Sequence, residues 1–132
     1  MSGHWTEPYL GLAHEPGGCW LLFLRVQRER FGRAIDEVGV PESLRERIAA
    51  LRAGSATGGW LKVETPRDGD GVLMSCSKHP HHVGVYVGDV GAVLHSCDGA
   101  GGMLHTMYHL QASRWRIVGF YRPSAELAEG AV

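Results

Sequence analysis

The sequence lacks an excess of charge of either sign. Thirteen Lys and Arg residues are balanced by fourteen Asp and Glu residues, and the formal net charge is −1. Nucleic-acid binders that neutralise phosphates carry a clear basic excess, so the composition argues against a nucleic-acid partner. It also offers no polybasic segment that would hold the chain on an anionic membrane surface.

A long hydrophobic stretch is also missing. The longest apolar run, Cys19 to Leu24, is far shorter than the roughly 20 residues that cross a bilayer. Residues 1–7 have neither the charged start nor the apolar centre of a signal peptide. We therefore expect no membrane insertion, and we expect the chain to be made in the bacterial cytoplasm without an ordinary export signal.

Cysteine is scarce, and the usual metal-binding spacings are absent. In a reducing compartment all three cysteines are expected to be reduced thiols. The sequence contains no Cys-x-x-Cys pair and no His-Glu-x-x-His motif. The residues that could still suggest zinc are His79, His81, His82, His105, His109, Cys76 and Cys97. Without those spacings the metal interpretation is weak, and we expect no metal and no cofactor.

What the chain does contain fits one packed domain. Hydrophobic residues make up 44% and charged residues 20% of the 132 residues, a balance typical of globular domains. No linker divides the chain, so we expect a single domain over residues 1–132 with its core at about residues 5–123. The residues after Pro123 are small and polar, and we expect a flexible tail there.

Helical patterns come first along the chain, and strand patterns follow. A helix is expected to begin at Cys19 with apolar residues on all sides and to stop at Gly32, and a second helix to begin near Pro41. Short strands are expected at residues 60–63, 71–75, 83–87, 92–96 and 116–121. This order predicts the α+β class, with two or three N-terminal helices packed on a roughly five-stranded antiparallel sheet.

Cys19 is the candidate nucleophile. It follows two glycines and opens the most hydrophobic helix of the chain. The N–H groups and partial positive charge at a helix start favour thiolate over thiol, and the same N–H groups can later bind an oxyanion. A small buried residue that merely fills space at the helix start is an equally good interpretation of this position alone.

Two histidines in a predicted hairpin favour the catalytic interpretation. If Gly88-Asp89 forms a two-residue loop, His82 lies directly opposite His95 on one face of the sheet. A four-residue loop would set His95 opposite Gly84, still on the face of His82, whereas a three-residue loop would turn His95 away. With both rings on one face, His82 can act as the base for Cys19 while His95 holds its tautomer. Two half-exposed strand histidines without a shared task are the simpler alternative.

Six short motifs follow one another between residues 5 and 123. They are Tyr9-Leu-Gly-Leu, Cys19-Trp-Leu-Leu, Pro66-Arg-Asp-Gly-Asp-Gly-Val-Leu-Met, His82-Val-Gly-Val-Tyr-Val-Gly, Val93-Leu-His95-Ser and Trp115-Arg-Ile-Val-Gly-Phe-Tyr-Arg-Pro. In type, order and spacing this set resembles the NlpC/p60-type cell-wall cysteine peptidases, and most of all their phage and prophage tail-associated branch.

The resemblance implies a papain-like (NlpC-type) fold and a thiol hydrolase, a cysteine endopeptidase or amidase. Cys19 would be the nucleophile, His82 the base and His95 the third catalytic residue, with no cofactor. The reaction implied is hydrolysis of amide bonds in peptidoglycan stem peptides by acyl transfer to Cys19. Weaker roles in oxyanion or substrate binding fall to Tyr9 and Gly18, and Gly18 stands where many wall-cleaving relatives have Asp.

The resemblance also implies a location and partners. A protein of this branch is carried in the phage virion tail and acts at the periplasmic cell wall, with peptidoglycan and other tail-tip proteins as partners. The alternative function is a structural tail-tip assembly subunit with a vestigial or secondary catalytic site. A metal-binding module is the third possibility.

Overall fold

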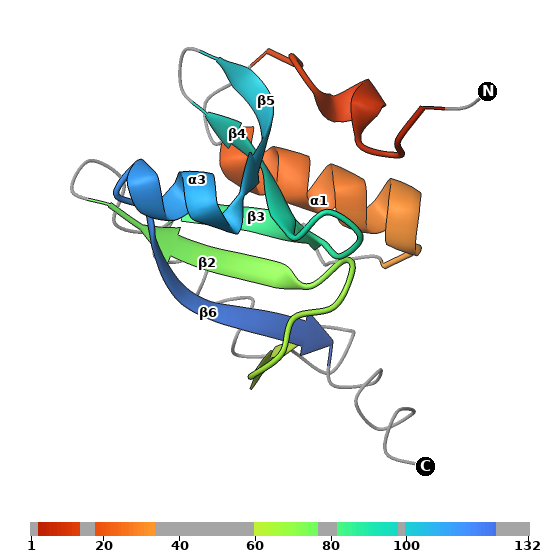
Figure 1. The fold of residues 1–132 in the computed structure, drawn as a ribbon. Helices are drawn as coiled ribbons and strands as arrows, with labels where there is room; N and C mark the ends of the chain where they lie inside the picture. The colour runs from red at the N-terminus through yellow and green to blue at the C-terminus, as the bar shows by residue number, and fades with distance from the viewer. Residues whose placement is uncertain (1–2, 14–17, 34–59, 77–81, 98–99, 124–132) are drawn as a thin grey trace.

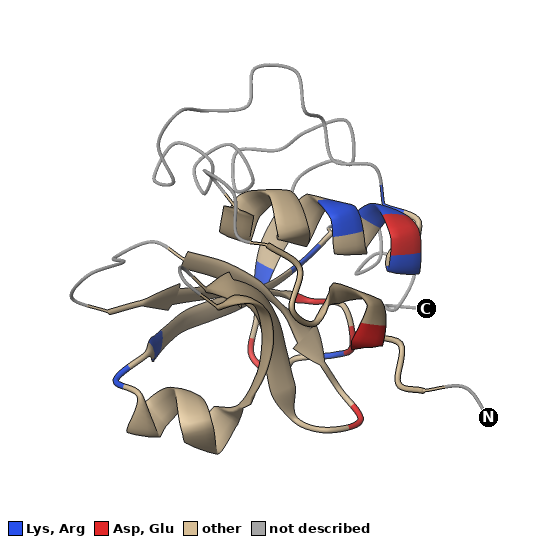
Figure 2. Ribbon diagram, turned by 90° about the horizontal axis from the view of Figure 1, so that it is seen from above, with Lys and Arg blue, Asp and Glu red and all other residues tan. Residues whose placement is uncertain are grey.

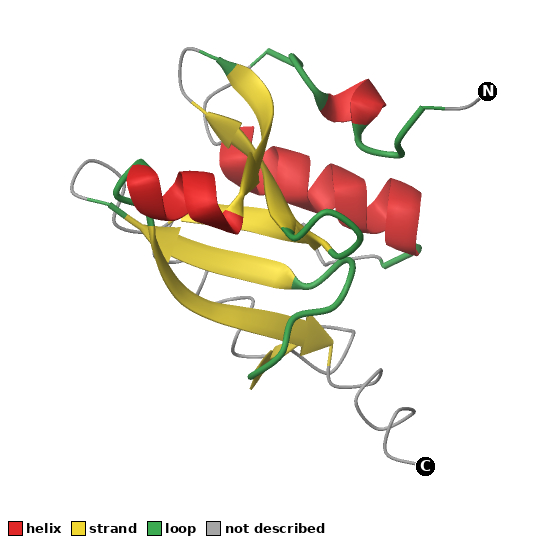
Figure 3. Cartoon of the chain, viewed as in Figure 1, coloured by secondary structure: helices red, strands yellow, loops and turns green. Residues whose placement is uncertain are grey.

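The computed structural model describes residues 3–13, 18–33, 60–76, 82–97 and 100–123 of the chain (Figure 1). Its elements follow one another as η1 (Glu7–Tyr9), α1 (Gly18–Phe31), β1 (Trp60–Val63), β2 (Gly71–Ser75), β3 (His82–Val87), β4 (Ala92–Cys97), β5 (Gly101–Thr106), α3 (Met107–Ala112) and β6 (Arg116–Pro123). Figure 3 shows that strands make up more of this structure than helices do.

The strands form one antiparallel sheet in the order β1-β6-β2-β3-β4-β5. From β2 to β5, each strand lies beside the next one in the sequence. The exception is β6, the last strand, which lies between β1 and β2. The register shifts between Leu73 and Met74 where β2 pairs with β6, an irregularity that bends paired strands.

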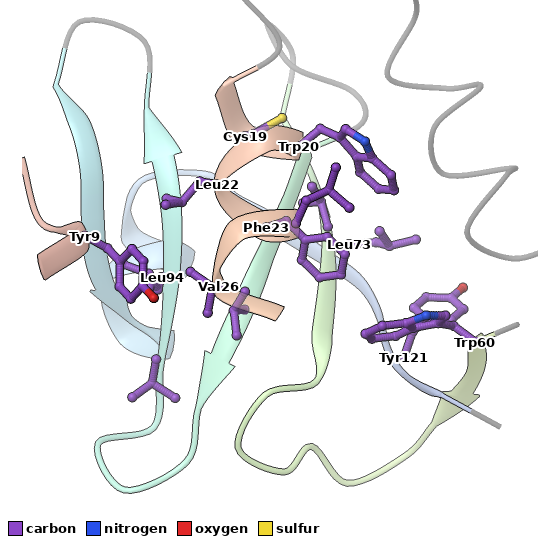
Figure 4. Close-up of a cluster of buried hydrophobic side chains, with 14 residues drawn as sticks. Tyr9, Cys19, Trp20, Leu22, Phe23, Val26, Trp60, Leu73, Leu94 and Tyr121 are labelled. Carbon is purple, nitrogen blue, oxygen red and sulfur yellow. The ribbon is translucent and has the colours of Figure 1, made fainter. Parts of the chain in front are cut away.

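Helix α1 packs on one face of the sheet, against β3 and β4 (Figure 1). Its apolar first half is buried, and it ends at Phe31 because Gly32 takes a left-handed conformation with φ +64°. Burial of each large apolar side chain stabilises the fold by roughly 1.5–3 kcal/mol. The buried cluster that includes this helix face (Figure 4) contains Cys19, Trp20, Leu22, Phe23, Leu24, Val26, Trp60, Leu73, Val83, Val85, Val87 and Leu94.

A second, smaller cluster covers the opposite face of the sheet, beneath α3. It consists of Val72, Met74, Val93 and Leu110. Helix α3 begins after Thr106, whose side-chain oxygen accepts a hydrogen bond from the backbone N–H of His109 at 3.1 Å. Because side chains alternate along a strand, neighbouring residues of β3 and β4 point to different clusters.

A buried ion pair joins the turn before β2 to strand β6. Arg122 donates from Nε to Oδ1 of Asp70 at 2.8 Å and from Nη2 to Oδ2 at 2.6 Å, and both residues are buried. Asp70 Oδ2 also accepts the backbone N–H of Arg67 at 2.7 Å. One carboxylate therefore closes the turn and holds β6 beside β2.

The prediction of an α+β papain-like (NlpC-type) fold is wrong. The described residues form mostly a six-stranded antiparallel sheet with one main helix, α1, and the short helix α3, which follows β5. The glycine-rich sequence at residues 99–102 by itself favours a turn. Instead, Gly101 and Gly102 pair with Cys97 and Ser96 of β4, and β5 is therefore the additional strand. These two residues lack side chains, and an added Cβ would collide with the backbone oxygens of Leu12 and Tyr9.

Individual elements agree with the sequence patterns better than the fold class does. The expected helix is confirmed with its stop at Gly32, and the five expected strands are confirmed as β1, β2, β3, β4 and β6. The helix expected near Pro41 and the tail expected after Pro123 lie outside the described residues. In the described part of the chain, no helix combines the length and the apolar character needed to cross a membrane.

Candidate active site

The loop that joins β3 and β4 is longer than the two residues predicted from the sequence. Val87 pairs with Ala92 and Val85 with Leu94, so four residues form the loop and the two-residue loop is wrong. The four-residue alternative holds: one further step along this register sets Gly84 opposite His95. A Cβ on Gly84 would lie 3.1 Å from Cβ of His95, which agrees with that register.

His82 and His95 are nevertheless in contact. Nε2 of His82 lies 2.8 Å from Nδ1 of His95, with the two rings near perpendicular at 82°. The exposed fractions are 6% for His82 and 1% for His95, so the hydrogen bond is shielded from water. The hairpin therefore brings the predicted base and the predicted orienting residue together.

Trp115, just before β6, covers the two imidazoles. Its ring centre lies 4.7 Å from that of His82 at an angle of 31° and 6.0 Å from that of His95 at 88°. From the sequence alone, the aromatic residues between 115 and 121 are explained most simply as sheet core. Here the indole keeps the His82 ring in one plane, a contact that sequence periodicity does not reveal.

A third imidazole extends the pair. Nδ1 of His105, on β5, lies 2.8 Å from Nε2 of His95. Cys97 Sγ lies 3.6 Å from Nδ1 and 3.8 Å from Nε2 of the same ring. These contacts were missed because β5 was missed. With β5 paired to β4, the match of Val93 with His105 puts His105 diagonally beside His95.

Burial disfavours a positive charge on His95 and on His105. Desolvation is the largest cause that lowers the pKa of His95 to about 3, and repulsion from His82 and then from His105 adds to it. The pKa of His105 is also lowered, first by burial and then by His109. Burial raises the pKa of the Cys97 thiol. At neutral pH His95 is therefore a neutral ring that donates through one nitrogen and accepts through the other.

Cys19 lies in the first turn of α1 and is buried, with an exposed fraction of 8%. It belongs to the same core cluster as Val83. Figures 1 and 4 show that α1 starts at the end of the sheet where β3 starts, with Cys19 in the first turn of the helix. His82 is the first residue of β3. The thiol and the base therefore belong to the same end of the molecule.

The two residues belong to different faces of the sheet, however. Val83 and Val85 pack beneath α1, whereas His82 stacks on Trp115, which packs with the cluster on the α3 side. Cys19 and His82 can therefore approach each other only around the end of the sheet. Their pairing stays a prediction.

Tyr9 is directed away from the proposed nucleophile. Its hydroxyl donates a hydrogen bond to Oε1 of Glu29 at 2.9 Å, and burial is the first cause of its raised pKa. Glu29 follows Cys19 by ten residues, which is about 15 Å along a helix. The structure thus gives Tyr9 a packing role on the second half of α1, and we leave it out of the proposed site.

Gly18 lines a pocket of about 410 Å³ beside the first half of α1. Other residues around it include Leu12, Ala13, Leu21, Leu22, Arg25, Arg28 and Ser96. Because Gly18 directly precedes Cys19 and has no side chain, a peptide backbone can approach the nucleophile closely there. Figure 2 shows that charged residues gather on the second half of α1, and Arg25 and Arg28 bring positive charge to the pocket.

Other residues considered from the sequence are less informative. His79 and His81 lie outside the described residues. Cys76 is partly buried after β2, and none of the three cysteines forms a disulfide. His109 is exposed on α3.

Comparisons with known proteins add no identification. No protein-family model matches the chain, and no curated protein matches it.

Proposed function

We propose that the chain is a thiol hydrolase in which Cys19 is the nucleophile, His82 the base and His95 the orienting residue. The observation that carries the proposal is the buried hydrogen bond of 2.8 Å between His82 Nε2 and His95 Nδ1. A buried pair of this kind fixes the orientation and tautomer of an imidazole, which is what a catalytic base needs.

The position of each proton follows from the row of rings. His82 can accept a proton at Nδ1 only if its own proton is on Nε2, and that proton is then donated to His95 Nδ1. Neutral His95 must carry its proton on Nε2, from which it donates to Nδ1 of His105 at 2.8 Å. Each of the two hydrogen bonds between the rings then has one donor and one acceptor, and Nδ1 of His82 is the basic atom.

The reaction would run by acyl transfer. His82 takes the proton of the Cys19 thiol, and the sulfur attacks the amide carbonyl while backbone N–H groups at the start of α1 stabilise the oxyanion. The tetrahedral intermediate collapses, the C–N bond breaks, and the leaving amine takes the proton from His82. Water, activated by His82, then attacks the thioester; this releases the carboxylic acid and returns the proton to sulfur.

The substrate proposed is an amide bond in a peptidoglycan stem peptide. The ordered motifs around Cys19, His82 and His95 support this class, because they resemble those of the NlpC/p60-type peptidases. The pocket beside Gly18 supports it as well: Arg25 and Arg28 suit the carboxylates that stem peptides carry. On the same resemblance we propose a phage tail protein that acts at the periplasmic wall.

A structural tail-tip subunit is the competing function. This function would apply if Cys19 and His82 never come into contact. The two residues belong to different faces of the sheet, which makes that outcome worth testing. The pH dependence of Cys19 alkylation by iodoacetamide separates the two, with each cysteine read individually by peptide mass spectrometry. The variants needed are His82→Ala and, as a control, His4→Ala, which changes a partly buried histidine outside the proposed site.

The hydrolase predicts rapid alkylation of Cys19 with an apparent pKa well below the value of about 8.5 for an ordinary thiol. This reactivity should be lost in His82→Ala and in urea, and kept in His4→Ala. Slow alkylation that is the same in the wild type and in His82→Ala would refute the catalytic pair and favour the structural role. A soluble stem peptide and purified peptidoglycan are then the substrates to assay against Cys19→Ala.

A further inference from the structure

We propose that His95, Cys97 and His105 bind a divalent transition metal ion, and that zinc fits their donor set best. One ligand atom from each of the three residues lies within 4.8 Å of the others. Two imidazole nitrogens and one thiolate sulfur form a donor set typical of zinc, with a fourth position left for water.

The local fold explains why these three side chains meet. His95 and Cys97 are two residues apart on β4 and so point to the same face of the sheet. His105 reaches that face from β5, because its partner in the ladder is Val93. All three ligands therefore stand on paired strands, which hold a metal site more rigidly than loops do.

Two of the three separations between donor atoms are close to those of a tetrahedral site, and the third is within 4.8 Å. Zn–N bonds of about 2.0–2.1 Å and a Zn–S bond of about 2.3 Å require N···N separations near 3.3 Å and N···S separations near 3.6 Å. His95 Nε2 lies 3.8 Å from Cys97 Sγ and 2.8 Å from His105 Nδ1. The sulfur is thus already at a suitable distance, and the two rings need to separate by only about 0.5 Å.

Binding of the metal ion releases one proton from the protein. Cys97 must lose its thiol proton to bind as thiolate, and that proton goes to solvent. His95 would coordinate through Nε2, so its remaining proton moves to Nδ1, where it is donated to Nε2 of His82. A metal-bound histidine usually donates its second N–H in this way, and the donation orients the ring.

This last step couples the metal to the proposed hydrolase, and it rests on that proposed function. When His95 donates to His82 Nε2, the proton of neutral His82 must be on Nδ1. Nδ1 then cannot take the proton of Cys19. The metal-bound and the catalytic states need opposite tautomers, so the metal should inhibit the enzyme without touching its nucleophile.

The binding site is tested first with Co²⁺ alone, added to the full chain after treatment with a chelator and a reductant. We expect one equivalent to bind with a thiolate-to-cobalt charge-transfer band, and Zn²⁺ to displace it. Cys97→Ser should abolish the band, and Cys97→Ser and His105→Ala should each weaken binding at least about tenfold. The matched control, Cys76→Ser, changes a partly buried thiol outside the cluster and should bind as the wild type does. Equal binding by the wild type and Cys97→Ser would overturn the site.

The coupling has a separate readout, the alkylation rate of Cys19 with and without Zn²⁺. The ion should slow alkylation at least tenfold in the wild type and leave it unchanged in Cys97→Ser, which keeps the fold because serine is nearly isosteric. Equal zinc sensitivity in both would mean that zinc binds Cys19 or His82 directly, and would overturn the coupling. Failure of cobalt binding removes the metal site and leaves the hydrolase proposal standing.

Discussion

Nε2 of His82 lies 2.8 Å from Nδ1 of His95, although the two residues are not directly opposed across the hairpin. The four-residue loop sets Gly84 opposite His95, and the contact to His82 is diagonal. A glycine at this position leaves space beside His95 that a larger side chain would fill. The geometry of the pair therefore depends on a residue that takes no part in the chemistry.

Substitution of His95 tests the orienting role. His95→Ala should lower the hydrolysis rate and the alkylation rate of Cys19 by roughly 10²–10⁴-fold, because His82 loses the acceptor that fixes its tautomer. His95→Asn keeps a polar atom near the position of Nδ1 and should retain more activity. Rates are measured between pH 5 and 9, with circular dichroism as the control for folding. An alanine variant as active as the wild type would contradict the role.

Adding one carbon to Gly84 should destabilise the fold and disturb the pair. A Cβ there would lie 2.5 Å from Cγ1 of Val93 and 3.0 Å from the backbone oxygen of Leu94. The expected loss for Gly84→Ala is about 1–3 kcal/mol in the free energy of unfolding, measured in urea. Gly88→Ala is the control, since its Cβ would meet nothing closer than 3.3 Å. Similar losses of free energy for both variants would show that neighbouring atoms shift to accommodate the Cβ at residue 84 without loss of stability.

The ion pair of Asp70 with Arg122 should be essential to stability. Asp70→Asn removes the negative charge beside the buried guanidinium of Arg122, and the expected loss is about 3–5 kcal/mol. For comparison, Asp89→Asn breaks the surface pair with His4 at 2.9 Å and should cost at most about 1 kcal/mol. Thermal and urea unfolding of both variants measure the difference. A loss below 1 kcal/mol for Asp70→Asn would contradict the importance of the buried pair.

The free energy of unfolding should decrease at acid pH because of His95. Its pKa is about 3 in the folded chain because of burial, against 6.5 in the unfolded chain. Between these values the unfolded chain binds a proton at His95 that the folded chain does not, so the free energy of unfolding decreases as the pH falls from about 6.5 to about 3. The loss from this residue reaches a few kcal/mol at the acid end.

Urea unfolding at pH 7 and pH 4.5, in the presence of a chelator, measures this dependence. His95→Asn, which does not titrate, should show a shallower loss over the same interval. If the wild type and the variant lose the same free energy, protonation of His95 is not the cause.

Residue patterns predicted the elements well because their causes are local. The apolar start of α1 and the left-handed Gly32 at its end are properties of a few neighbouring residues. The contact of His82 with His95 could also be predicted, because two of the three loop lengths considered place both rings on one face of the sheet. Local patterns alone thus indicate the pair but leave its register open.

The predictions that were wrong concern contacts between residues far apart in the sequence. Gly101 and Gly102 predict a turn locally, yet they extend β5 because Tyr9 and Leu12 approach their backbone closely. Without β5 the sheet has one strand too few, and His105 is not recognised as a neighbour of His95. The direction of the Tyr9 hydroxyl toward Glu29 likewise follows from how the N-terminal segment packs on α1.

Among the described strands, β1 pairs only with β6. During translation β2 to β5 can pair in the order in which they leave the ribosome, whereas β1 must wait for the last strand. Until then one edge of β2 and both edges of β1 stay open, and unpaired edges invite association between chains. Asp70 is likewise without Arg122 until that moment. Ribosomes that stall before residue 116 should therefore release aggregation-prone chains, and expression should be sensitive to the speed at which the last strand is synthesised.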